Sequence, residues 1–455
     1  MISRIKKIII WADIDRATLF SVSARVWSVI AGPITFAIIG LGFTKDEQGY
    51  YMSFLSVVGY TVFVQFGLGR VIIQFSSHEW AHVGFDKNGG VVGDADAKSK
   101  LSSLARFAIK WFVIGGFFSA IALSVGGYLF FTFSKQPATP LAWQAPWLAL
   151  CLLVGIDFLF YPLYYLLEGC GKTSFVYQFN FWRGLLGNFT IWTAIYLGAG
   201  LWTYPIFFLV NLPVILFFVV YKHRNFFVSL LFNEKSSKVF NWFQEILPMQ
   251  WQTTIISICS YFMFQMFTQS SMYARGPARA GQTGMTWSMI LMLGLLMSAF
   301  IAPKMPKFGM LIAHKKYKEF DNLFFKAYSI GAGTLIAGAI SMIIGVFVLN
   351  TVPIKLFNYY SQRILPLLPT TIFLLAFFLW NLMVQLGLYL IAHKKMPHWW
   401  IIASATCFAS ISTWYFGGKY GLTGAGIGLI VVYIIHCPIM FFLWRRCRLE
   451  WHYKE

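Results

Sequence analysis

Residues 364–391 read ILPLLPTTIFLLAFFLWNLMVQLGLYLI, a run that contains no charged residue. A helix needs about 20 consecutive apolar residues to cross the hydrocarbon core of a bilayer. The run is long enough for such a crossing, and its length and composition do not suit a surface helix of a soluble protein. The sequence therefore predicts a membrane-spanning helix over residues 364–391.

Comparable apolar runs recur along the whole chain. The 455 residues are 58% hydrophobic and only 11% charged, whereas soluble domains average about 25% charged residues. We therefore expect an all-α integral membrane protein with about twelve transmembrane helices. The expected spans lie near 18–42, 49–75, 107–133, 141–167, 173–199, 202–221, 246–272, 285–303, 328–350, 364–391, 399–416 and 422–443.

The basic residues predict the orientation of these helices. The net charge is +20, and about 25 of the 36 Lys and Arg residues fall in loops on the same side as the N-terminus. This bias predicts that both termini are cytoplasmic, and it argues against a nucleic-acid-binding surface. The long loops at 76–106, 222–245 and 304–327 fall on that side. We expect an N-terminal six-helix lobe at 1–221, an inter-lobe loop at 222–245 and a C-terminal lobe at 246–455.

Charged residues inside the fourth and fifth spans indicate a functional region. A charge in the bilayer costs about 2.5–3.5 kcal/mol and needs a partner or a hydrated cavity. One helical face of the fourth span carries Asp157, Tyr161, Tyr164, Tyr165 and Glu168, and one face of the fifth carries Asn180, Arg183, Gly184, Gly187 and Asn188. Asp157 and Arg183 lie at nearly equal depth on either side of a turn near Gly171. We predict that they pair, either as a static lock or as a cavity pair that a substrate or proton disrupts.

Two further cations, Arg25 and Arg70, lie at matching depths on the first and second spans. They repel one another unless an anion or a hydrated cleft lies between them. Arginine binds phosphate groups bidentately, so a phosphate or pyrophosphate would suit this pair. Alternatively, Arg70 reaches the cytoplasmic headgroups with its long side chain. Tyr161, Tyr164 and Tyr165 are the aromatic residues that we expect to contact sugar rings.

Residues 78–82, His78-Glu79-Trp80-Ala81-His82, match the zinc-protease pattern H-E-x-x-H. In that interpretation His78 and His82 bind zinc and Glu79 is the general base. No third ligand appears at a recognisable spacing, and the stretch lies at the edge of the second span, so we prefer an amphipathic helix end. The six cysteines form no CxxC pair, and we expect neither a metal nor another cofactor. No Walker A pattern is present.

The chain resembles bacterial O-antigen and polysaccharide flippases of the superfamily that also contains multidrug and oligosaccharidyl-lipid exporters. The resemblance rests on residues 21–35 (SVSARVWSVIAGPIT), 47–51 (EQGYY), 66–69 (FGLG), 247–252 (LPMQWQ) and 280–285 (AGQTGM). It implies two six-helix lobes around a central cavity that opens to each side in turn. It also implies a role for Arg25 in the cavity and, by the same reasoning, for Arg183.

The resemblance further implies a cargo of undecaprenyl-pyrophosphate-linked oligosaccharide, which a multi-pass protein of the bacterial inner membrane moves to the outer leaflet. Such a protein serves cell-surface polysaccharide and lipopolysaccharide synthesis, in contact with membrane lipids and with glycan polymerase and chain-length machinery. We expect a monomeric transporter without enzyme activity. A multidrug exporter of the same fold remains an alternative, because Asp157 and Glu168 would suit cationic drugs.

Overall fold

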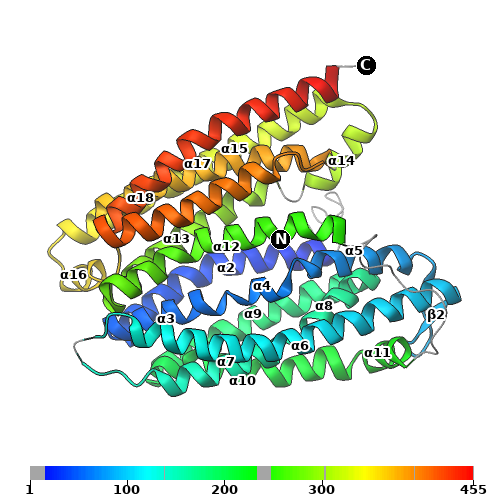
Figure 1. Ribbon diagram of the computed structural model, residues 1–455, viewed down its shortest axis with the longest axis horizontal. Helices are drawn as coiled ribbons and strands as arrows, with labels where there is room; N and C mark the ends of the chain where they lie inside the picture. Colours follow the sequence, from blue (N-terminus) through cyan, green and yellow to red (C-terminus); the bar gives the residue numbers. More distant parts are fainter. Residues whose placement is uncertain (1–15, 138, 233–246, 302–303, 394, 454–455) are drawn as a thin grey trace, which may run out of the picture. The chain divides into compact units, whose positions relative to one another are not determined.

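The computed structural model describes residues 16–453 except 138, 233–246, 302–303 and 394. These residues are almost entirely helical and form two compact units (Figure 1). Unit 1 comprises residues 1–43, 60–129 and 142–254, and unit 2 comprises 44–59, 130–141 and 255–455. The chain therefore passes between the units more than once. The short segments 44–59 and 130–141 belong to the unit that is otherwise built from the second half of the sequence.

Unit 1 contains the helices that precede residue 255 apart from the segments just named. They are α2 (Arg16–Gly42), α4 (Thr61–Gln65), α5 (Leu68–Trp80), most of α6 (Ala95–Phe133), α7 (Gln144–Phe158), α8 (Tyr161–Leu167), η1 (Glu168–Lys172), α9 (Thr173–Tyr196), η2 (Gly200–Trp202), α10 (Thr203–Ile215), η3 (Leu216–Tyr221) and α11 (Arg224–Leu231). A two-stranded antiparallel hairpin, β1 (Val83–Phe85) and β2 (Val91–Gly93), joins α5 to α6.

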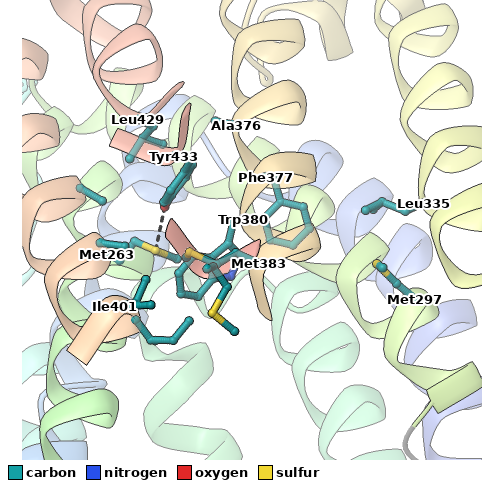
Figure 2. Close-up of a cluster of buried hydrophobic side chains, with 14 of the residues drawn as sticks. Met263, Met297, Leu335, Ala376, Phe377, Trp380, Met383, Ile401, Leu429 and Tyr433 are labelled. Atoms are coloured by element: carbon teal, nitrogen blue, oxygen red, sulfur yellow. Dashed lines mark hydrogen bonds between the residues drawn. The ribbon is translucent and has the colours of Figure 1, made fainter. Parts of the chain in front are cut away.

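Unit 2 contains α3 and the helices of the second half. They are α3 (Lys45–Val58), most of α12 (Leu247–Arg275), α13 (Pro277–Ile301), α14 (Met305–Ala313), α15 (Tyr317–Thr351), α16 (Lys355–Ser361), α17 (Leu367–Ala392) and α18 (Trp399–Tyr453). Its core is rich in aromatic and sulfur-containing side chains. Figure 2 shows part of this core, where the Tyr433 ring lies 5.7 Å from that of Trp380 and its hydroxyl donates to Sδ of Met263 at 2.9 Å.

The expectation of an all-α membrane protein is confirmed. Within the described residues, six helical segments are long and apolar enough to cross a bilayer, and a seventh is added if α3 to α5 form one bent span. Two of the six, Gln144–Tyr196 and Trp399–His452, are 53 and 54 residues long, which is enough for two crossings each. Helices α2, α12 and α13, which have 27, 29 and 25 residues, are also long enough to cross a bilayer.

Glycines divide the two longest helical segments. Between α8 and α9 the backbone leaves helical geometry at Cys170 and Gly171, where Gly171 has φ of 78°. Within α18 it does so at Gly421, where φ is 73°. Only glycine adopts a positive φ without steric cost, so each residue allows the chain to change direction. The turn predicted near Gly171 is confirmed, and the expected spans 399–416 and 422–443 lie on either side of Gly421.

Several helices extend beyond the apolar runs that predicted them. Helix α6 begins at Ala95, although its apolar run begins at residue 107, and α15 begins at Tyr317 instead of 328. The stretch 76–106, expected to be a loop, consists of the end of α5, the β-hairpin and the start of α6. Hydropathy detects only the part of a helix that lies in hydrocarbon, whereas the hydrogen-bonded helix continues into the polar region.

The second expected span, 49–75, is one helix in the prediction but is interrupted twice in the structure, after Val58 and at Phe66–Gly67. Phe66 and Gly67 both have positive φ, 49° and 66°. The carbonyl oxygen of Phe66 accepts hydrogen bonds from Nε2 of Gln250 at 2.8 Å and from Oγ1 of Thr254 at 3.0 Å. A helix break at membrane depth is tolerated only where its freed backbone groups find such partners.

Candidate functional site

Asp157 and Arg183 form the ion pair that their sequence positions predicted. Asp157 lies near the end of α7 and Arg183 lies in α9, and Nη2 of Arg183 is 2.6 Å from Oδ1 of Asp157. The Asp157 side chain is 8% exposed and that of Arg183 is 18% exposed. Because α7, α8 and α9 double back at η1, two residues at equal distances from the turn meet. The pair has no net charge, which makes its burial in a membrane segment tolerable.

Two aromatic side chains from α8, Tyr161 and Tyr164, lie near this ion pair. The Tyr161 ring lies against Phe158 and Phe112, with centroids 5.3 and 6.3 Å apart. Tyr164 stacks on Phe179 of α9 at 5.6 Å, one helical turn before Arg183. The predicted common face of Asp157, Tyr161 and Tyr164 therefore does assemble against α9. It forms a compact layer of rings with a single polar pair beside it.

Two polar groups of this layer have unused hydrogen-bonding capacity. Nε of Arg183 and the hydroxyl of Tyr164 are buried, and neither has a hydrogen-bond partner among the described residues. Buried polar groups are nearly always hydrogen-bonded, so an exception calls for an explanation. A bound anion or sugar hydroxyl would satisfy them: guanidinium donates to oxygen anions, and a phenol both donates and accepts.

Glu168 forms the far end of the same face, in the distorted turn η1. Its Oε1 accepts a long hydrogen bond of 3.4 Å from the hydroxyl of Tyr177. The Tyr165 ring lies close to Gly69 of α5, where a Cβ atom would meet its Cζ at 2.6 Å. The second acidic residue of the predicted face thus lies at the α5–η1 junction, and no contact between it and the Asp157–Arg183 pair is seen among the described residues.

The polar face of α9 is divided in the structure. Asn180 and Gly184 are exposed on unit 1, and a Cβ at Gly184 would meet no atom within 4 Å. Asn188 is half-buried. Gly187, in contrast, packs directly against the Phe207 ring of α10. Glycine therefore serves helix packing at one position of the face and leaves open space at another.

The structure describes the side chain of Arg70 but not that of Arg25. Arg70 lies in the first turn of α5, directly after Gly69, and is exposed. Arg25 lies in α2, but its side chain is outside the described residues. Helix α2 runs along α9, with Trp27 packing against Phe189 and Trp192. Whether the two arginines share one anion is therefore still a prediction.

The H-E-x-x-H motif lies at the end of α5. Glu79 is buried, and its Oε1 is 3.7 Å from Nζ of Lys100 on α6 and 3.5 Å from Nδ1 of His78. The rings of His78 and His82 have centroids 6.4 Å apart. Within the part of the chain that the structure describes, no three His, Cys, Asp or Glu side chains are grouped so as to hold a metal ion.

Unit 2 contains a buried cation, Arg363, that is not among the predicted site residues. Arg363 is only 4% exposed, and its guanidinium donates to Oε1 of Gln48 at 3.3 Å and to the Tyr359 hydroxyl at 2.5 Å. Its position immediately before the apolar run 364–391 was the available signal. The burial itself depends on Gln48, which is distant in sequence.

The fold can be compared with those of solved structures. An inward-facing multidrug resistance transporter of the MATE family and the MOP superfamily superposes with a TM-score of 0.62 at 12% identity, over 93% of this chain and 99% of the other. The MATE multidrug transporter DinF-BH gives 0.63 at 12%, over 97% of each chain. The lipid II flippase MurJ, in an inward closed conformation, gives 0.59 at 14%, over 95% of this chain and 90% of MurJ.

The sequence matches no protein-family model and no curated protein. At identities this low the superpositions establish the fold and leave the cargo open. The chain is thus a multi-pass membrane protein with the fold shared by the MATE transporters of the MOP superfamily and the lipid II flippase MurJ.

Proposed function

We propose that this protein is a transporter that flips a polyprenyl-pyrophosphate-linked oligosaccharide across a bacterial inner membrane by alternating access. In this proposal both termini are cytoplasmic, the N-terminal lobe ends at residue 221 and the C-terminal lobe begins at 246. The protein works as a monomer and carries out no covalent chemistry. The glycan enters a polar cavity while the polyprenyl tail remains in lipid, and the product supplies cell-surface polysaccharide synthesis.

The observation that carries the proposal is the state of Arg183. Its guanidinium is mostly buried, is paired with Asp157 through one nitrogen, and has a second nitrogen, Nε, without a partner among the described residues. A pyrophosphate would accept hydrogen bonds from such a group and compete with Asp157 for it. Arg25 and Arg70 would add positive charge on the cytoplasmic side, where the cargo enters.

The tyrosine layer supports a glycan as the part of the cargo that follows the phosphates. Tyr161 and Tyr164 provide ring faces and hydroxyl groups next to the ion pair. Sugars present both apolar ring faces and hydroxyl groups, so they suit such surfaces better than a purely ionic site does. Asn180 and Asn188 on α9 would add amide donors and acceptors along the same helix.

Export of a cationic drug is the second candidate function. Both MATE structures compared above are of multidrug transporters. In that case Asp157 and Glu168 would bind the cargo, and Arg183 would hold Asp157 in the absence of drug. The two candidate functions differ in the charge of the cargo: an anionic cargo would take Arg183 from Asp157, and a cationic cargo would take Asp157 from Arg183.

Transport by the purified protein in liposomes tests the proposal directly. A short-chain polyprenyl-pyrophosphate glycan and a lipophilic cationic dye are offered in parallel, and zinc content is measured on the same sample. We expect saturable flipping of the glycan lipid, no transport of the dye, and loss of glycan flipping in Arg25→Ala. Transport of the dye alone would favour the drug exporter, and stoichiometric zinc would return attention to His78, Glu79 and His82.

Tyr164→Phe separates a cargo contact from a structural role. Removal of a buried hydroxyl without a partner should leave the melting temperature unchanged or raise it, because no internal hydrogen bond is lost. If that hydroxyl binds the glycan, the affinity for the lipid-linked glycan should fall by about fivefold, as expected for one neutral hydrogen bond of about 1 kcal/mol. Tyr196→Phe, at a largely exposed ring, is the matched control. Unchanged affinity in Tyr164→Phe would remove Tyr164 from the site.

A further inference from the structure

A second buried polar cluster lies in unit 2, where the ends of three helices meet. Asp321 of α15 accepts hydrogen bonds from Nε and Nη2 of Arg448 at 3.0 and 2.7 Å and from the Tyr389 hydroxyl at 2.6 Å. Arg448 belongs to the C-terminal arm of α18 and Tyr389 to α17. These three helices run side by side up to the end that carries the C-terminus (Figure 1). The cluster thus joins the ends of α15, α17 and α18.

Two histidines complete the cluster. Nε2 of His393, which follows α17, is 2.9 Å from Nε2 of His452 on α18. The imidazole of His452 is 1% exposed, lies flat on the Tyr317 ring at 4.3 Å, and directs its Nδ1 to within 3.8 Å of Oδ2 of Asp321. Among the described residues, the titratable and charged groups near the two rings include Tyr317 and Asp321 from α15, Tyr389 from α17, Lys395 from the segment between α17 and α18, and Arg448 from α18.

The hydrogen bonds define where the protons are when both rings are neutral. Nδ1 of His393 lies 3.1 Å from the backbone carbonyl of Tyr389, which can only accept, so Nδ1 carries the proton. Nε2 of His393 is then an acceptor, and the proton in the 2.9 Å contact must belong to Nε2 of His452. Nδ1 of His452 is consequently the nitrogen that has no proton, and it is the one that faces Asp321.

This arrangement defines a place for one additional proton. On Nδ1 of His452 it would turn a contact between a lone pair and a carboxylate into an ion pair, and the face of the Tyr317 ring would favour the resulting cation. Two effects oppose that charge in the packed state. Burial disfavours imidazolium and lowers the pKa of His393, and Arg448 already neutralises Asp321.

We propose that His452, His393 and Asp321 form a proton-binding site, which takes up one proton at Nδ1 of His452 when the ends of α17 and α18 move apart. Separation would admit water to the rings and loosen the Arg448–Asp321 pair, and both changes raise the proton affinity of His452. By linkage, a lower pH then favours the separated state of these helix ends. If this proton uptake is coupled to movement of the cargo, transport depends on a proton gradient. That coupling rests on the proposed function, whereas the proton site does not.

Nitrogen NMR of histidine-labelled protein in nanodiscs tests the site without any cargo. At about pH 8 we expect His393 to be protonated at Nδ1 and His452 at Nε2. On acidification to about pH 5, His452 should gain its second proton and the His393 signal should shift with it. His393→Gln and His452→Gln assign the signals, and His436→Gln is the control, since its ring bonds only to Val432 of its own helix among the described contacts. The opposite tautomers, or an unchanged His452 signal, would refute the site.

Asp321→Asn keeps the site testable if a histidine variant does not fold. Removal of the carboxylate charge should move the titration of His452 to lower pH by about one unit or more. Glu319→Gln is the matched control on the same helix, because Glu319 is exposed and pairs with Lys316. A titration that is equal in both variants would place the proton away from Asp321 and overturn the assignment.

Transport measurements then test the coupling separately. In proteoliposomes, a proton gradient should change the rate of glycan-lipid flipping by the wild-type protein, and this dependence should vanish in His452→Gln while cargo binding remains. Flipping that ignores the gradient in the wild type would reject the coupling but leave the proton site intact. A wild-type protein that titrates as expected but flips no glycan lipid would refute the proposed function alone.

Discussion

Replacement of the Asp157–Arg183 ion pair by two apolar residues, Asp157→Val with Arg183→Met, is expected to leave the protein folded but unable to flip its cargo. Exchange of a buried ion pair for well-packed apolar side chains is often neutral or stabilising, because the desolvation cost of both charges disappears. If Arg183 binds the pyrophosphate, its loss removes charge-assisted hydrogen bonds of about 1.5–3 kcal/mol each. The rate of flipping should then fall by about 10- to 100-fold.

The single variant Arg183→Met should behave differently from the double variant. It leaves Asp157, which is 8% exposed, buried without its cation, and this typically costs about 3–5 kcal/mol. We therefore expect a large drop in melting temperature in nanodiscs that Asp157→Val restores. Comparison of the melting temperatures of the single and double variants shows how far the two residues depend on each other for stability. The flipping rate shows whether the pair takes part in transport. A double variant that is stable and flips at the wild-type rate would identify the pair as a static lock.

Gly49→Ala is expected to abolish correct assembly of unit 2. A Cβ atom at Gly49 of α3 would overlap the carbonyl oxygen and Cα of Pro277, at the start of α13. These are backbone atoms that cannot rotate away, so the two helices would have to separate. Overpacking in a rigid core costs about 1–3 kcal/mol where side chains can adjust, and backbone contacts leave less room for adjustment. We expect the protein to lose its monodisperse peak in size-exclusion chromatography.

Neighbouring glycines on α13 show that this contact extends along both helices. A Cβ at Gly284 would meet Cβ of Met52 at 2.7 Å, and one at Gly281 would meet the backbone nitrogen of Gly49 at 3.0 Å. Small residues allow such close helix approach in membranes. Gly333→Ala in α15 is the control, because a Cβ there meets nothing within 4 Å and alanine favours the helix by up to about 1 kcal/mol. Equal chromatographic behaviour of Gly49→Ala and Gly333→Ala would contradict the prediction.

The number of residues between a charged residue and the nearest turn was enough to predict part of the candidate site. Asp157 and Arg183 were matched by their distances from Gly171, and the 2.6 Å contact between Nη2 of Arg183 and Oδ1 of Asp157 confirms the pair. Counting works here because α7 to α9 double back at one turn, so equal distances from the turn mean equal depth.

Other contacts in the structure could not be predicted by counting residues from a turn. The cluster of Asp321, Tyr389, His393, Arg448 and His452 combines three helices whose contributing residues lie far apart in the sequence. No local pattern in the sequence connects them. The contact of Arg363 is equally non-local, because its partner Gln48 lies near the start of the chain.

The sequence by itself determined that this protein is an all-helical membrane protein, because the length and composition of each apolar run depend only on local residues. It also determined the hairpin of spans that pairs Asp157 with Arg183. Only the tertiary structure decided which unit each helix joins, including the placement of α3 with the second half of the chain. It alone placed His452 between His393 and Asp321, because in a bilayer helices choose their neighbours through close packing and hydrogen bonds, which hydropathy does not encode.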